Sequence, residues 1–247
     1  MRFLVAAVVS IFLMTGAIAQ QLSATDPRAW EVQANKLRAA NNWSGLLEHA
    51  DRWIKLLPST AEAWNAKSEA HLQMGQPLLA EAPAKEAIRL KPDLGEAWAN
   101  LAYFQATYSD LLFSYVETTR TAREAIRLKR ECPVAWLALG IAEHRGRHKE
   151  AAVEALQEAI RLDPNYAPAW RQLAIQFRLL KRYDEAIGAF HHATALRPDD
   201  VRAIYGLGIT YAEIGQRKRV EEIYERLTAV DPQLANQFYE DVVLHPQ

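Results

Sequence analysis

The chain has 247 residues and a formal net charge of -1, with 50% hydrophobic and 24% charged residues. This ordinary globular composition can bury a sizeable core, and it excludes a strong attraction of the whole molecule to nucleic acid or anionic lipid. The charges are uneven, because residues 120–219 carry 18 Lys and Arg against 12 Asp and Glu, while residues 220–247 carry 1 against 6. A basic body with an acidic end favours an acidic partner, although solvated helix faces explain the same pattern.

The N-terminus has the three parts of a secretory signal. Arg2 precedes an apolar run at residues 3–14, and the small residues Ala17 and Ala19 follow. This pattern predicts a signal peptide at residues 1–19, resembling a bacterial one, with cleavage after Ala19. The alternative is an uncleaved anchor, since about 17 apolar residues are at the short end of a membrane span. We therefore expect an exported protein that is periplasmic or secreted, or anchored in the inner membrane if the segment is retained.

Beyond a short segment at residues 20–26, the chain repeats itself. Five tryptophans are spaced 34, 34, 38 and 34 residues apart, at Trp30, Trp64, Trp98, Trp136 and Trp170. Five prolines keep the same phase, at Pro58, Pro92, Pro164, Pro198 and Pro232. A regular period of this length indicates a stack of similar helical units that share one continuous core.

The spacing inside each repeat predicts two amphipathic helices. In the fourth repeat, Trp136 is followed by Leu139 and Gly140, and then by Ala152 and Leu156. The apolar residues recur three and four apart, as on one face of a helix, and the small residues lie where two helices approach closely. A proline then prevents the second helix from continuing. The only cysteine, Cys132, leaves no intramolecular disulfide, so the fold depends on its apolar core.

These units resemble tetratricopeptide repeats, whose pattern is W-x2-L-G-x2-Y … A-x3-F … P. The resemblance covers six units, at residues 27–60, 61–94, 95–132, 133–166, 167–200 and 201–234. It implies an all-α, right-handed superhelical solenoid of about six helix-turn-helix repeats, closed by a capping helix and tail at residues 235–247. The third repeat departs most, with four extra residues and Arg130 in place of the terminal proline. In the capping segment we expect Leu234, Phe238, Val242 and Val243 to face inward.

In such solenoids the first helix of each repeat lines a concave surface that binds peptides. The early part of this surface is polar, whereas the later part mixes aliphatic, aromatic and cationic residues. The candidate groove residues are Tyr103, Leu137, Ile141, Arg145, Arg171, Ile175, Arg178, Arg202, Tyr205 and Ile209. Apolar side chains left in water usually mark a binding site, but some of these positions could instead pack against the neighbouring repeat. The expected partner is a protein or peptide with apolar anchors and acidic flanks.

Evidence for other chemistry is weak. We find no catalytic or nucleotide-binding motif, expect no cofactor, and assign no catalytic residue. His144 and His148 are four residues apart, but Arg145 and Arg147 between them would repel a metal ion. The aromatic residues of the basic segment lie at core positions, which argues against nucleic-acid binding.

The sequence thus predicts a non-catalytic protein- or peptide-binding scaffold or assembly adaptor. One alternative is a membrane-anchored assembly factor of an envelope complex, and a weaker one is a metal protein or enzyme that uses His144 and His148.

Overall fold

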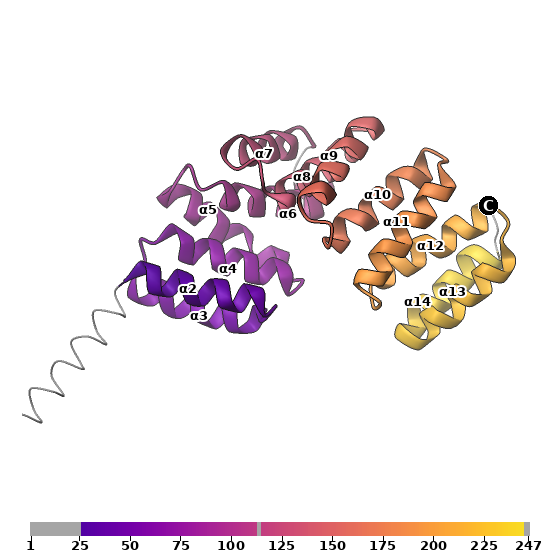
Figure 1. Cartoon of the computed structure of the whole chain (residues 1–247), viewed down its shortest axis with the longest axis horizontal. Helices are drawn as coiled ribbons and strands as arrows, with labels where there is room; N and C mark the ends of the chain where they lie inside the picture. Colours follow the sequence, from indigo (N-terminus) through magenta and orange to yellow (C-terminus); the bar gives the residue numbers. More distant parts are fainter. Residues whose placement is uncertain (1–25, 113–114, 245–247) are drawn as a thin grey trace, which may run out of the picture. The chain divides into compact units, whose positions relative to one another are not determined.

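The computed structural model describes residues 26–112 and 115–244, and these residues form helices and turns without any strand (Figure 1). The first three helix pairs are α2 (Pro27–Ala39) with α3 (Trp43–Leu56), α4 (Ala61–Gln73) with α5 (Glu81–Leu90), and α6 (Gly95–Leu112) with α7 (Tyr115–Leu128). The next three are α8 (Pro133–Arg145) with α9 (Lys149–Leu162), α10 (Ala167–Leu179) with α11 (Tyr183–Leu196), and α12 (Val201–Glu213) with α13 (Arg217–Val230). A short 3-10 helix, η1 (Pro77–Leu79), precedes α5, and the chain closes with α14 (Pro232–Phe238) and a π-helix, η2 (Tyr239–Leu244).

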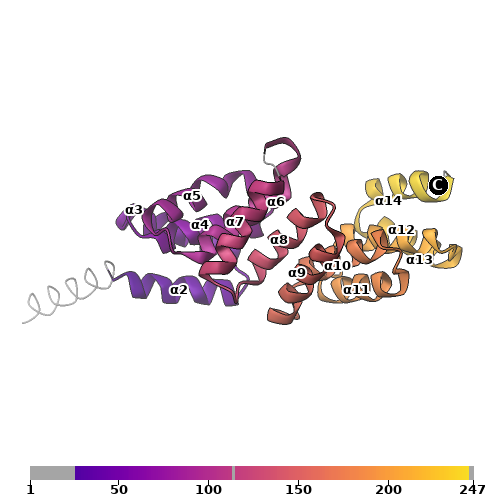
Figure 2. The same ribbon diagram turned by 90° about the horizontal axis from the view of Figure 1, so that it is seen from above.

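The chain divides into two compact units, the N-terminal unit at residues 1–104 and the C-terminal unit at residues 105–247. Within the C-terminal unit, α10 to α13 lie side by side in chain order (Figure 2). Each first helix there packs against its own second helix and against the second helix of the preceding pair. This arrangement confirms the expected all-α helical-repeat solenoid, while its handedness stays a prediction.

The turn that joins the two helices of a repeat has one recurrent backbone geometry. A residue with positive φ occupies the same place in the described turns, at Asn41, Gly75, Arg147, Lys181 and Gly215. In the fifth repeat, the N–H of Lys181 donates to the carbonyl of Arg178 at 2.9 Å, and that of Arg182 to the carbonyl of Phe177 at 2.8 Å. These two bonds form a Schellman motif, which satisfies the last carbonyls of the first helix. In the described turns, the first helix therefore ends with a left-handed residue rather than with a proline.

A second recurrent bond explains why tryptophan and proline keep one phase. The indole Nε1 of Trp64, Trp98 and Trp170 donates to the carbonyl of Pro58, Pro92 and Pro164, each at 2.8 Å. In the fourth repeat, Trp136 makes the same 2.8 Å bond to the carbonyl of Arg130. The acceptor is a backbone carbonyl, so the hydrogen bond between consecutive repeats is kept where Arg130 replaces the proline.

Glycines mark the closest approaches between helices. A Cβ at Gly140 would lie 2.6 Å from Cγ of Leu156, and one at Gly208 would lie 2.5 Å from the ring of Phe238. Neither distance can accommodate a side chain, so α8 and α12 pack against their neighbours through bare backbone. Phe238 itself is fully buried, which is consistent with the expected role of α14 as a cap.

Three further expectations concern the insertion in the third repeat and the N- and C-terminal segments of the chain. The extra residues of the third repeat belong to α6, which has 18 residues where the other first helices have 13. The predicted signal segment and the side chain of Val243 lie outside the described residues. Among the helices that are described, none combines the length and apolar character needed to cross a bilayer.

Candidate functional site: the first-helix face of the C-terminal unit

An isoleucine occupies the same position of three successive first helices. Ile141 lies on α8, Ile175 on α10 and Ile209 on α12, and each side chain is half-buried. On the same helices Leu173 and Leu207 are more deeply buried, at 4% and 1% exposed. The three isoleucines hold equivalent positions of consecutive repeats and keep part of their apolar surface exposed, and they are here called the isoleucine row.

The position one turn before the isoleucine row is more buried than the sequence suggested. Leu137 has no exposed surface at all, so the expectation that it contacts a partner is wrong. Leu137 lies on α8, which packs against α7 and α9 and also contacts α10. Arg171 occupies the same position in α10, and its side chain is only 15% exposed.

Two of the expected groove cations are neutralised inside the unit. Nη1 of Arg171 lies 3.1 Å from both carboxylate oxygens of Asp200, and Nη1 of Arg178 lies 2.6 Å from Oε1 of Glu213. Both pairs connect α10 to α12 or to the residue that caps it. Arg171 and Arg178 therefore hold consecutive repeats together, and they do not offer free charge to a ligand.

Further hydrogen bonds connect the first helices α8 and α12 to later elements. Nδ1 of His144 on α8 lies 3.0 Å from Oε1 of Gln176 on α10. Burial, with help from the positive charges of Arg145 and Lys149, lowers the pKa of His144 against the opposing effect of Gln176. The hydroxyl of Tyr205 on α12 donates to Asp241 at 2.8 Å, and burial together with this carboxylate raises the pKa of Tyr205 to about 12.

The remaining candidate residues differ in their surroundings. Arg202 is exposed near the start of α12, and Arg145 is half-buried at the end of α8. Tyr103 is half-buried on α6 within the N-terminal unit, whereas the other nine candidates belong to the C-terminal unit.

Sequence reasoning missed one residue of this face. Gln176 is 1% exposed, and its Nε2 has no hydrogen-bond partner among the described residues. Nε of Arg178 is likewise buried without an acceptor there. Buried N–H groups without acceptors are rare and need an explanation. On this face, α10 carries two of them, at Gln176 and Arg178. A glutamine at a core position of an otherwise apolar repeat was the available signal.

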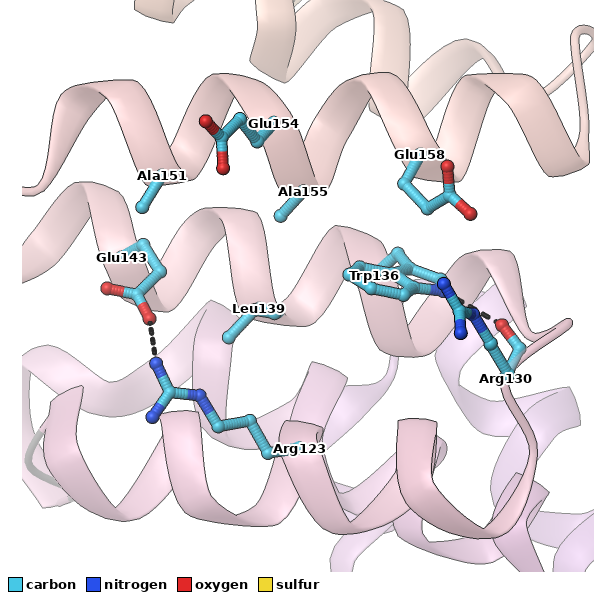
Figure 3. Close-up of a pocket in the computed structure, with 9 residues that line it drawn as sticks. All are labelled: Arg123, Arg130, Trp136, Leu139, Glu143, Ala151, Glu154, Ala155 and Glu158. Atoms are coloured by element: carbon cyan, nitrogen blue, oxygen red, sulfur yellow. Dashed lines mark hydrogen bonds and ion pairs between the residues drawn. The ribbon is translucent and has the colours of Figure 1, made fainter.

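A cleft of the C-terminal unit lies between α7 and α9 and over α8 (Figure 3). It encloses about 410 Å³, with Trp136 and Leu139 on its floor. The buried carboxylate of Glu143 binds Arg123 at 2.9 Å and Nδ1 of His148 at 2.8 Å. Both carboxylate oxygens of Glu143 are thus engaged by neighbouring side chains. One repeat later, His192 occupies the position of Glu158 and stacks on Trp170 with 4.4 Å between ring centroids.

The same bonds weaken the metal alternative. The Nδ1 atoms of His144 and His148 are directed to different partners, Gln176 and Glu143. Over residues 26–112 and 115–244, no group of three or more His, Cys, Asp or Glu side chains is placed to hold a metal ion.

Comparisons with known proteins agree with the helical architecture. Models of the tetratricopeptide repeat match residues 61–94, 133–175 and 178–238, which together exceed half of the chain. No curated protein matches the sequence.

Solved structures share the fold at low sequence identity. PilF of Pseudomonas aeruginosa is 16% identical, with a TM-score of 0.63 over 87% of this chain and 96% of that one. PilW, described as a type IV pilus biogenesis factor, is 17% identical, with a TM-score of 0.62 over 83% and 93%. YrrB, described as a TPR protein with an unusual peptide-binding site, is 20% identical, with a TM-score of 0.52 over 77% and 97%. The chain belongs to the tetratricopeptide repeat family, whose members are generally non-catalytic protein-interaction scaffolds.

Proposed function

We propose that the chain is a scaffold that binds a protein or peptide segment along the first-helix face of the C-terminal unit. The observation that carries this proposal is the isoleucine row, in which Ile141, Ile175 and Ile209 are half-buried at one repeat position. A repeated apolar position that the fold itself does not cover favours a partner with regularly spaced apolar anchors. Each anchor that becomes fully buried could contribute roughly 1.5–3 kcal/mol.

The polar surroundings refine the kind of segment expected. Arg171 and Arg178 are paired with Asp200 and Glu213, so acidic flanks on the ligand have less to bind than the sequence suggested. We therefore favour an apolar segment over a strongly acidic one.

The structural neighbours support this class of function without identifying the partner. YrrB is described as having a peptide-binding site and PilW as a pilus biogenesis factor, and both share this fold. An assembly role in the cell envelope is the second candidate, favoured by the signal-like residues 1–19. Intact mass of the protein recovered from cells separates export with cleavage from membrane anchoring, because cleavage after Ala19 removes those residues.

Peptide selection tests the groove directly. Peptides would be selected from a random phage-displayed library against the full chain, and their affinities measured by fluorescence anisotropy. We expect replacement of Ile141, Ile175 and Ile209 by alanine to weaken the selected peptides at least roughly tenfold, because each loses part of its apolar contact.

A matched control uses three other apolar residues of the same unit. Val116, Leu196 and Val230 are 60%, 37% and 44% exposed, and their replacement by alanine should leave the affinity within about twofold. Circular dichroism would check that both triple variants keep their helicity. Equal loss in the two variants, or no loss in the isoleucine variant, would exclude the isoleucine row as the binding surface.

A further inference from the structure

The isoleucine row repeats at the spacing of the first helices of the C-terminal unit. Ile141, Ile175 and Ile209 hold the same position of α8, α10 and α12, so each isoleucine is displaced from the previous one by one repeat. The helix α10 contacts both α8 and α12, and helices in contact have axes about 8–10 Å apart. A partner that contacts all three isoleucines therefore needs apolar anchors at roughly this spacing.

This spacing distinguishes between the conformations that a bound segment can adopt. In an extended strand, every second residue points the same way, so side chains on one face lie about 6.6 Å or 13 Å apart. In an α-helix, residues seven apart lie almost on one face and about 10.5 Å apart. In a polyproline helix, residues three apart lie about 9.3 Å apart on one face. The two helical conformations match the isoleucine row, and the extended strand does not.

Polar side chains beside the row distinguish between the two helical conformations. Three of them lie one helical turn from an isoleucine and are hydrogen-bonded within the unit: Arg171 with Asp200, Arg178 with Glu213, and His144 with Gln176. A polyproline segment has no internal hydrogen bonds, so its backbone carbonyls lose their bonds to water unless the groove supplies donors. An α-helix satisfies its own backbone and needs mainly apolar contact from a groove. The engaged polar groups therefore favour an α-helix.

Charge complementarity defines the contact stripe of this helix. Two of the pairs join an arginine to a carboxylate, at 3.1 Å and 2.6 Å, so their charges cancel within the unit. Arg202 is exposed, but it lies seven residues before Ile209 and therefore about 10 Å away along α12. Because a helix is itself about 10 Å wide, Arg202 reaches only its flank. An uncharged stripe thus complements the isoleucine row, and an acidic residue is favoured only on the flank near Arg202.

We propose that the isoleucine row binds one amphipathic α-helix of a partner protein, with apolar residues at every seventh position. This helix lies across α8, α10 and α12, and its three anchors span about 15 residues and four turns. The inference rests on the proposed function and adds to it the conformation and the sequence period of the ligand.

Selection from three competing peptide libraries tests the conformation. Each library displays segments of about 20 residues on phage and fixes three leucines, seven apart without proline, three apart in a proline-rich background, or two apart in an alternating one. The libraries compete for the full chain, and the affinities of the recovered peptides are measured by fluorescence anisotropy. We expect binders from the seven-residue library. Replacement of the three isoleucines by alanine should weaken them at least about tenfold.

Two changes in a recovered peptide test its helix and its register. Proline at a central, solvent-facing position should weaken binding about a hundredfold, whereas alanine there should change it less than about twofold. Replacement of the central leucine by alanine should weaken binding to the unsubstituted chain about tenfold, but to Ile175→Ala less than about threefold. The reason is that the central anchor faces Ile175 in either orientation of the helix. The control triple Val116→Ala, Leu196→Ala, Val230→Ala should keep the full loss.

The outcomes separate this inference from the proposed function. Binders that are unaffected by the isoleucine variant, or no binder from any library, would overturn both. Binders that depend on the row but come only from the other two libraries, or that tolerate the central proline, would retain the proposed function and overturn the helix. Self-association of the chain that the isoleucine variant abolishes, measured by sedimentation velocity, would instead assign the row to a second copy.

Discussion

The first-helix faces of the two units differ in chemistry although they share one architecture. In the N-terminal unit, Arg38 on α2 binds Glu31 at 3.0 Å and Glu69 of α4 at 2.7 Å, and Asn100 donates to Asn65 at 2.9 Å. Burial alone would lower the pKa of Arg38, but Glu69 and Glu31 outweigh it and raise that pKa. Polar contacts thus connect the first helices of this unit, whereas the C-terminal unit keeps an isoleucine row among its polar contacts.

Bonds that do not involve this face are common to both units. The indole-to-carbonyl bond has the same 2.8 Å length for Trp64 in the N-terminal unit and Trp170 in the C-terminal unit. The left-handed turn residue also recurs in both, as Gly75 and Gly215. The repeated residues therefore specify packing, and the residues that vary at fixed positions specify what each unit can bind.

The largest expected effect is a loss of stability that is confined mainly to one unit. Trp53 and Phe190 are fully buried in the second helices α3 and α11, so replacing either by alanine should cost about 3–5 kcal/mol of unfolding free energy. Repeat proteins lose cooperativity between distant repeats, so each change should act mainly on its own unit. Urea unfolding followed by hydrogen exchange would locate the loss. Leu56→Ala and Leu196→Ala, at more exposed positions, serve as controls, and a loss spread evenly over both units would contradict the division.

The next effect concerns the indole-to-carbonyl bond, which occurs separately in each unit. Trp64→Phe and Trp170→Phe each remove the indole donor while keeping an aromatic ring, and each should cost about 1 kcal/mol of unfolding free energy. Trp170→Phe should cost slightly more, because Trp170 also stacks on His192. Urea denaturation measures both values. A cost in one unit alone would contradict the view that the bond is a common packing element.

A smaller effect is expected at the left-handed turn position, which holds Lys181 in one unit and Gly75 in the other. Each residue is replaced by the one that the other unit has at this position. Lys181→Gly should stabilise the C-terminal unit by about 0.5–1 kcal/mol, since relief of the left-handed conformation exceeds the greater chain entropy of glycine. Gly75→Lys should destabilise the N-terminal unit by a similar amount, and nothing lies within 4 Å of its added Cβ to contribute a clash. Thermal unfolding measures both, and shifts of the same sign would contradict the argument from φ.

The sequence alone predicted the helical repeats, because a 34-residue period with apolar spacing of three and four has few other structural explanations. It could not predict the burial of Leu137, since the same repeat position holds a polar residue in other repeats and burial there depends on how the neighbouring helices pack. The pairing of Arg171 with Asp200 was also inaccessible, because it joins residues 29 apart through the stacking of two repeats. Periodicity thus identifies the face of a helix, and only the contacts between repeats decide which residues of that face are available.

The smallest effect is a pH dependence expected in the C-terminal unit. His144 contacts Gln176 there, and burial lowers the pKa of His144 below its usual 6.5. As the pH falls through 6.5, the unfolded chain takes up a proton before the folded chain does, so stability present above that pH is lost. Burial also lowers the pKa of His191, which adds to the same loss. Thermal unfolding at pH 7 and pH 5 should therefore show a smaller pH-dependent decrease for His144→Asn than for the unsubstituted chain. The Thr210→Ser variant, on the same face without a titrating group, should keep the full decrease, and an unchanged decrease in His144→Asn would mean that His144 does not contribute.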